Sequence, residues 1–86
     1  MTRFKTLDTD LVAQAAQLLA ETQFGSITML QRRLSINYAM ACRVMDALEA
    51  AGIVGPPIGG GARVVLIDGD GPAAAQTATT WLTNQQ

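Results

Sequence analysis

Residues 28–51 read TMLQRRLSINYAMACRVMDALEAA, and this segment contains two helical patterns separated by a tight turn. Thr28 and Gln31 have the spacing of a capping box, which predicts a short helix that ends near Leu34. Asn37 is a favourable N-cap for the longer helix that follows. A short helix, a tight turn and a longer helix predict a helix-turn-helix unit.

The longer helix has an apolar face and a mixed face. Apolar residues recur in it three and four positions apart, which places them on one side of the helix. They are Ala41, Val44, Met45 and Leu48. The opposite side is expected to show Ala39, Met40 and Arg43, with Asp46 and Ala47 at its margin. This second face is the one predicted to meet a partner.

The segments around this unit complete the pattern of a small domain. The expected elements are a first helix over residues 10–22, a minimal strand at 26–27, a hairpin formed by 53–54 and 63–67, and a last helix over 72–82. The hairpin tip is rich in glycine and proline, which no helix could cross. We therefore predict a mainly α fold with a small β-hairpin, a winged helix-turn-helix plus an extra C-terminal helix.

Length and composition limit the chain to one small domain. Its 86 residues are 49% apolar and include 14 alanines, so we expect a thin, mostly helical core. The chain has no histidine and a single cysteine, Cys42, which excludes an internal disulfide, a cysteine–histidine zinc site and a catalytic triad that needs an imidazole. The longest apolar run has five residues, far fewer than the ~20 of a membrane span. We expect no membrane association, no metal or cofactor and no enzyme activity.

The charges are distributed unevenly along the chain. The formal net charge is −1, yet residues 22–45 contain three arginines and no acidic residue. A local positive face on an acidic protein can still meet phosphate, because screening limits the reach of a charge to ~8–10 Å. The alternative interpretation is an ordinary solvated helix face.

The helix-turn-helix geometry assigns chemistry to these arginines. The second helix of such a unit enters the major groove of DNA, where Arg43 could hold a guanine through two hydrogen bonds. Arg32 and Arg33 lie on the preceding helix, whose side chains usually meet backbone phosphates. Arg63 follows the glycine-rich tip and is expected to reach phosphate or the minor groove. The residues predicted to contact DNA are Arg32, Arg33, Asn37, Tyr38, Ala39, Met40, Arg43 and Arg63.

Each of these assignments has a structural alternative. Arg43 could pair with Asp46 three residues further along the helix. Asn37 is first of all a helix cap, and Tyr38 could be half-buried in the domain. Trp81, in the last helix, could close the core of the monomer or form an interface between two copies.

Residues 31–43, together with EAAGIVGP at residues 49–56, resemble the gamma domain of FtsK-type DNA translocases. The resemblance extends over about residues 8–67 and implies a winged helix that reads short G-rich orienting sequences on bacterial chromosomes. It also implies that Arg32, Arg33, Arg43 and Arg63 contact DNA. The family usually has Gly-Tyr-Asn-Arg-Ala-Ala-Arg where this chain has NYAMACR at residues 37–43. Two polar base readers are thus replaced by Ala39 and Met40, which implies the same scaffold with a different target.

We therefore expect a sequence-specific binder of double-stranded DNA, a small transcriptional repressor that acts by operator occupancy in the cytoplasm, associated with a nucleoid or plasmid. The expected organisation is an N-terminal arm over residues 1–7, a winged-helix domain over 8–67, and a C-terminal helix and tail over 68–86 as a candidate dimerisation element. About four arginines give few phosphate contacts, so tight binding is expected to need a homodimer or paired binding on half-sites. The alternatives are a reader of orienting sequences that recruits a translocase, and a winged-helix module that binds a protein partner through an apolar helix face.

Overall fold

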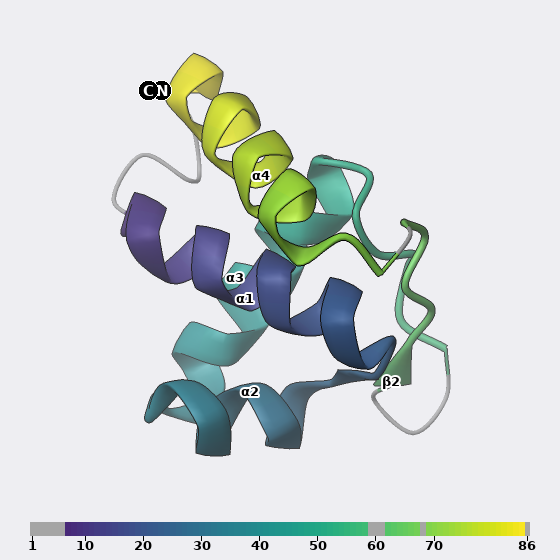
Figure 1. The fold of residues 1–86 in the computed structure, drawn as a ribbon. Helices are drawn as coiled ribbons and strands as arrows, with labels where there is room; N and C mark the ends of the chain where they lie inside the picture. Colours follow the sequence, from purple (N-terminus) through teal and green to yellow (C-terminus); the bar gives the residue numbers. More distant parts are fainter. Residues whose placement is uncertain (1–6, 59–61, 68, 86) are drawn as a thin grey trace.

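The computed structural model describes residues 7–58, 62–67 and 69–85, and these residues form four helices and one short strand pair (Figure 1). The elements are α1 (Thr9–Thr22), β1 (Gly25–Ser26), α2 (Ile27–Leu34), α3 (Tyr38–Ala50), β2 (Ala62–Arg63) and α4 (Gly71–Gln85). This order confirms the predicted fold class, a mainly helical winged helix-turn-helix with an additional C-terminal helix.

α4 lies against α1, and of the described elements these two helices share the most extensive contact (Figure 1). Small side chains allow the close approach, and the buried ones are Ala15, Ala16 and Ala20 of α1 with Ala74 and Ala78 of α4. Gly71 is buried in the first turn of α4, close to the side chains of Gln17 and Glu21 of α1. Leu82 is fully buried and Trp81 is partly buried against the core. Both residues therefore help to close the core of a single chain.

Each helix of the helix-turn-helix unit begins at a side-chain cap. Asn37 caps α3 as predicted, because its Oδ1 accepts a hydrogen bond from the Met40 amide at 2.8 Å. The capping box at Thr28 was wrong, since α2 begins at Ile27 and is capped by Ser26, whose hydroxyl accepts from the Met29 amide at 3.2 Å. Ser26 is also the last residue of β1, and its extended backbone has the conformation that an N-cap requires.

The wing, which includes the described residues 53–58 and 62–67, keeps part of the predicted hairpin. Val54 and Val65 form an antiparallel bridge, and backbone hydrogen bonds of 2.8 and 2.9 Å join the residues on either side of it. β2 adds a pairing that was not predicted, because it runs antiparallel to β1 with Gly25 opposite Arg63. A Cβ atom at Gly25 would lie 2.0 Å from the carbonyl oxygen of Arg63, so this pairing requires a glycine. The glycines at 59–61 of the predicted tip lie outside the described residues. The strand pair therefore connects the wing to the start of α2.

The core contains the predicted face of α3, including Val44, Met45 and Leu48, all without exposed surface. Ala47 is also buried, so its predicted place beside the exposed face was wrong. It lies three residues after Val44, which puts it on the same side of the helix. Residues 1–6 of the predicted N-terminal arm lie outside the described residues, whereas Leu7 packs in the core. No helix among the described residues is long and apolar enough to cross a membrane.

Candidate nucleic-acid interface

The first turns of α3 present the side chains that the sequence analysis assigned to base contacts. Tyr38 is 63% exposed, and Ala39 and Arg43 are exposed as well. Met40 is only partly exposed, because it packs against the core. Asn37 is exposed while its Oδ1 caps the helix. The exposed side chains in the first two turns of α3 are thus one aromatic ring, one small apolar group and one guanidinium, those of Tyr38, Ala39 and Arg43.

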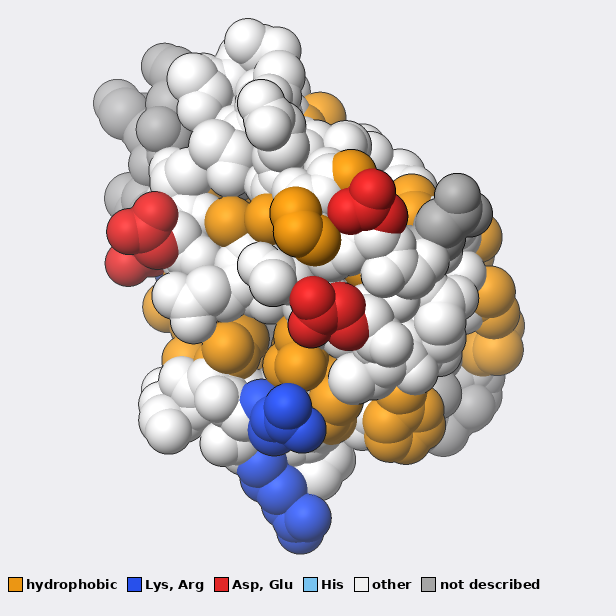
Figure 2. Space-filling view, viewed as in Figure 1, with side chains coloured by type: hydrophobic (Ala, Val, Ile, Leu, Met, Phe, Trp, Pro, Cys, Tyr) orange, Lys and Arg blue, Asp and Glu red, His pale blue; other side chains and the backbone are white. Residues whose placement is uncertain are grey.

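The other two predicted arginines project from α2, the helix that packs against α3. Arg32 and Arg33 are both exposed in the last turn of α2, where a cation interacts favourably with the negative end of the helix dipole. Figure 2 shows basic side chains at the α2 end of the molecule, while the acidic side chains on this face lie over α1 and the start of α4. One acidic side chain lies near the basic end (Figure 2), since Glu21 and Arg33 line one shallow hollow.

An open hollow lies beside these arginines. It has a volume of about 450 Å³ and is lined by Phe24, Ser26, Thr28, Met29, Arg32 and Arg33. Two guanidinium groups beside two hydroxyl side chains form a surface of hydrogen-bond donors, which suits a phosphate oxygen.

Tyr38 has a perturbed phenol. The side-chain hydrogen bond with Cys42, one turn further along α3, and the charge of that thiol group raise the pKa of Tyr38 above its ordinary value of 10.0. The exposed phenol can donate a hydrogen bond to a phosphate or a base edge.

Arg63 does not lie where the sequence analysis placed it. The residue is only 9% exposed, and its guanidinium points to α3: Nη1 donates to Oε1 of Glu49 at 3.0 Å and Nη2 lies 3.3 Å from Oδ1 of Asp46. Nη1 also lies 3.4 Å from the carbonyl oxygen of Met45. The prediction that Arg63 reaches phosphate or the minor groove is therefore corrected: its side chain is engaged inside the fold.

The pairing of β2 with β1 explains this orientation. Arg63 is the last residue of β2, and Val64, which follows the strand, is 55% exposed. The chain thus continues the alternation of an extended segment, with Arg63 inward and Val64 outward. Two partners of Arg63, namely Asp46 and Glu49, were not predicted from the sequence. Their spacing of three on one helix places both carboxylates on one side, and this spacing was a usable signal.

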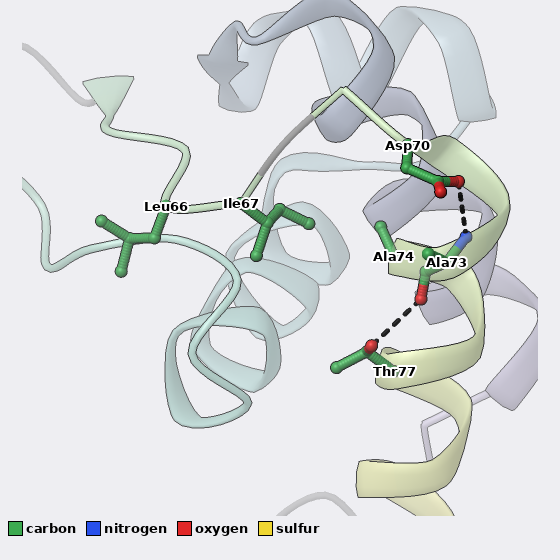
Figure 3. A pocket seen from close by; sticks show the side chains of 6 residues that line it. All are labelled: Leu66, Ile67, Asp70, Ala73, Ala74 and Thr77. Carbon is green, nitrogen blue, oxygen red and sulfur yellow. Dashed lines mark hydrogen bonds between the residues drawn. The ribbon is translucent and has the colours of Figure 1, made fainter.

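A second hollow, of about 420 Å³, lies between the segment after β2 and α4 (Figure 3). Its carboxylate, Asp70, accepts a hydrogen bond from the Ala73 amide at 3.1 Å and so caps α4. The Thr77 hydroxyl donates to the Ala73 carbonyl oxygen at 3.0 Å. These polar groups therefore form hydrogen bonds within the first turns of α4.

Comparison with known proteins gives one consistent family. Residues 7–68 match the family model described as the Ftsk gamma domain. The DNA translocase FtsK of Streptomyces avermitilis is 52% identical over 63 residues, which are 73% of this chain and 7% of the translocase. The DNA translocase FtsK of Mycobacterium tuberculosis (strain H37Rv) is 49% identical over 63 residues, 73% of this chain and 8% of the translocase. That of Oceanobacillus iheyensis is 49% identical over 61 residues, 71% of this chain and 8% of the translocase. The chain thus spans a small part of the length of these relatives.

Proposed function

Because this chain belongs to the FtsK gamma domain family, we propose that it binds double-stranded DNA by placing α3 in the major groove. The observation that carries the proposal is the set of three exposed arginines, Arg32, Arg33 and Arg43, on the two adjacent helices of the helix-turn-helix unit. In such a unit the second helix approaches base edges and the first crosses the backbone. The same division assigns Arg43 to bases and the α2 arginines to phosphates.

The proposed binding is sequence-selective. A bidentate contact from Arg43 to guanine contributes about 1–3 kcal/mol of discrimination. Ala39 and Met40 offer apolar contact to thymine methyl groups, whereas the family pattern has polar side chains at these positions. We therefore expect a target that contains guanine but differs from the G-rich sequences implied by the family resemblance.

The proposed biological role is repression by occupancy of an operator. Arg63 is held inside the fold, so the arginines left for phosphate contact are few. Affinity from so few contacts is low at physiological salt, and we expect two copies bound on neighbouring half-sites. We propose a binding role rather than an enzyme, because Asp8 and Asp70 cap helices while Asp46 and Glu49 are partners of Arg63.

A second candidate function is a reader of DNA orienting sequences that recruits a translocase. The identity of 49–52% to DNA translocases favours it. Its target would be the family's G-rich motif, whereas the repressor would select another sequence. A protein-binding role for the apolar part of α3 remains a third candidate, but the burial of Ala47 reduces the apolar surface available for it.

Selection of bound sequences from random duplex DNA at ~50 mM salt, followed by mass measurement of the complex, tests the proposal. We expect an enriched motif that contains guanine, with a mass that gives the number of copies bound. Enrichment of the G-rich orienting motif would favour the second candidate. The absence of any DNA binding at this salt concentration would contradict both and leave the protein-binding role.

A further inference from the structure

We infer that Arg63 is a positioning residue for DNA binding, which docks the wing on α3 and offsets two carboxylates there without contacting DNA itself. The inference rests on the proposed function, since it concerns the helix that is proposed to enter the major groove. The position of Arg63 after the glycine-rich tip suggested a contact with phosphate. The proposed role is different, because it acts through α3.

The geometry of the cluster supports this role. Both terminal nitrogens of Arg63 face α3, at 3.0 Å from Glu49 and 3.3 Å from Asp46. The Arg63 side chain is 7% exposed, whereas those of Asp46 and Glu49 are 37% and 40% exposed. The cation is therefore covered, and the two anions lie at the surface of the proposed recognition helix.

The net charge of α3 explains why this cluster should affect DNA binding. α3 carries one arginine, Arg43, and two carboxylates, Asp46 and Glu49, so the helix alone has a net charge of −1. Arg63 brings this local sum to zero. At a rise of about 1.5 Å per residue, Asp46 lies about 4.5 Å along the axis from Arg43, well within the range over which charges act in physiological salt. A phosphate or base that meets Arg43 therefore also experiences the charge of these carboxylates.

The folding stability of the domain is by itself a weak reason for an arginine at position 63. An apolar side chain of similar length could fill the same space, and replacing a buried ion pair by apolar residues is often neutral or stabilising. Nε of Arg63 is buried and has no hydrogen-bond partner among the described residues, which adds a cost of desolvation. The charge of Arg63 thus acts mainly on the surface that α3 presents.

The salt dependence of binding distinguishes this role from a phosphate contact. An arginine that contacts phosphate releases a counterion from DNA, so its removal lowers the slope of log K against log salt by about 0.9. A covered arginine that offsets carboxylates contributes no such counterion. Its removal weakens binding through repulsion while the slope keeps its value.

The experiment measures dissociation constants of the full chain for one mixed-sequence duplex over a series of salt concentrations. The variants are Arg63→Met, the triple variant Arg63→Met/Asp46→Asn/Glu49→Gln, and Arg63→Lys, which keeps the cation. Arg32→Met is the matched control for a direct phosphate contact. Thermal unfolding followed by circular dichroism establishes that each variant is folded at the assay temperature.

We expect Arg63→Met to weaken binding roughly three- to thirtyfold with an unchanged slope, because the positive charge of Arg63 no longer offsets the two partly exposed carboxylates. The triple variant should recover to within about threefold of the original affinity, since its carboxylates are neutral. Arg63→Lys should stay close to the original protein in affinity and slope, because it keeps the cation. If Arg63→Met does not fold, the triple variant decides the question, since the loss of a phosphate contact would lower its slope by about 0.9 and the loss of an offset would not. Arg32→Met should lower the slope by about 0.9.

Two results would overturn the inference. A slope that falls by about one in Arg63→Met, with no recovery in the triple variant, would make Arg63 a phosphate contact. An affinity of Arg63→Met equal to that of the original protein would show that the offset has no effect on binding. If the original chain itself fails to bind the duplex at low salt, the proposed function fails and the inference falls with it.

Discussion

α1 and α4 bury small side chains between them, whereas α2 and α3 direct three arginines outward. On the α1–α4 side, Ala15, Ala16, Ala74 and Ala78 lie in the core and bring two helices close together. On the α2–α3 side, Arg32, Arg33 and Arg43 are exposed. α2 and α3 also contribute to the core, through Leu30, Met45 and Leu48 among others. The contact between α1 and α4 therefore serves folding, whereas the outer face of α2 and α3 is the surface proposed to bind DNA. Changes in the α1–α4 contact and changes of the exposed arginines should therefore affect different measurements.

Leu82→Ala should have the largest effect on stability. Leu82 is a fully buried side chain of α4, and its truncation leaves a cavity that costs about 2–5 kcal/mol. Chemical denaturation measures the loss, and the exposed neighbour Thr83→Ala serves as a control with a change near zero. DNA affinity of the folded fraction should stay the same. A lower affinity of fully folded Leu82→Ala would break the division between the two sides.

Gly25→Ala should destabilise the junction between wing and α2 by about 1–3 kcal/mol, because the added Cβ would lie 2.0 Å from the carbonyl oxygen of Arg63. Gly55→Ala is the matched control, since the nearest atom to its Cβ is the Val64 carbonyl oxygen at 3.9 Å. Thermal unfolding of both variants gives the comparison. Equal stability of the two variants would show that the close approach of β1 and β2 is not required.

Local signals predicted the helix-turn-helix unit because each of its boundaries has its own chemistry. The cap at Asn37 and the spacing of Val44, Met45 and Leu48 act within one helix, and both were confirmed. The direction of Arg63 depends on its register with Gly25, thirty-eight positions earlier in the chain, and no local pattern contains that register.

The candidate site was predictable to a similar extent. The exposure of Arg32, Arg33 and Arg43 follows from helix periodicity and was confirmed, whereas their contact with DNA stays a prediction. The inward direction of Arg63 depends on which face of the two-residue strand β2 meets α3. A strand of two residues is too short for the sequence pattern to predict which of its faces is buried. The ion pairs of Arg63 with Asp46 and Glu49 were therefore found only in the structure.

Asn37 caps α3 and is also predicted to contact DNA, and two substitutions separate these roles. Asn37→Ala removes the side chain that caps α3 and should cost about 0.5–2 kcal/mol of stability. Asn37→Asp keeps an acceptor for the Met40 amide and should leave the free energy of unfolding nearly unchanged. The added negative charge should weaken DNA binding. Denaturation and binding assays on both variants check this, and unchanged DNA affinity in Asn37→Asp would place residue 37 outside the interface.

The smallest expected effect concerns Tyr38, the single tyrosine of the chain. Its pKa is raised above 10.0, so the folded chain should release this proton at a higher pH than the unfolded chain does. The contribution to stability is present below pH 10.0 and is lost as the pH rises through the folded pKa. Absorbance of the tyrosinate follows the titration. Cys42→Ala should lower the midpoint toward the ordinary value, and an unchanged midpoint would exclude Cys42 as the cause.

The central claim is that Arg43 reads bases while Arg32 holds the backbone, and one pair of affinities tests it. The measurement is the ratio of dissociation constants for the selected duplex and for a shuffled duplex of the same composition. Arg43→Ala should reduce this ratio by roughly 5- to 150-fold, the equivalent of about 1–3 kcal/mol of discrimination, while Arg32→Ala weakens both duplexes alike. Equal weakening of both duplexes by Arg43→Ala would contradict the placement of α3 in the major groove with Arg43 on a base.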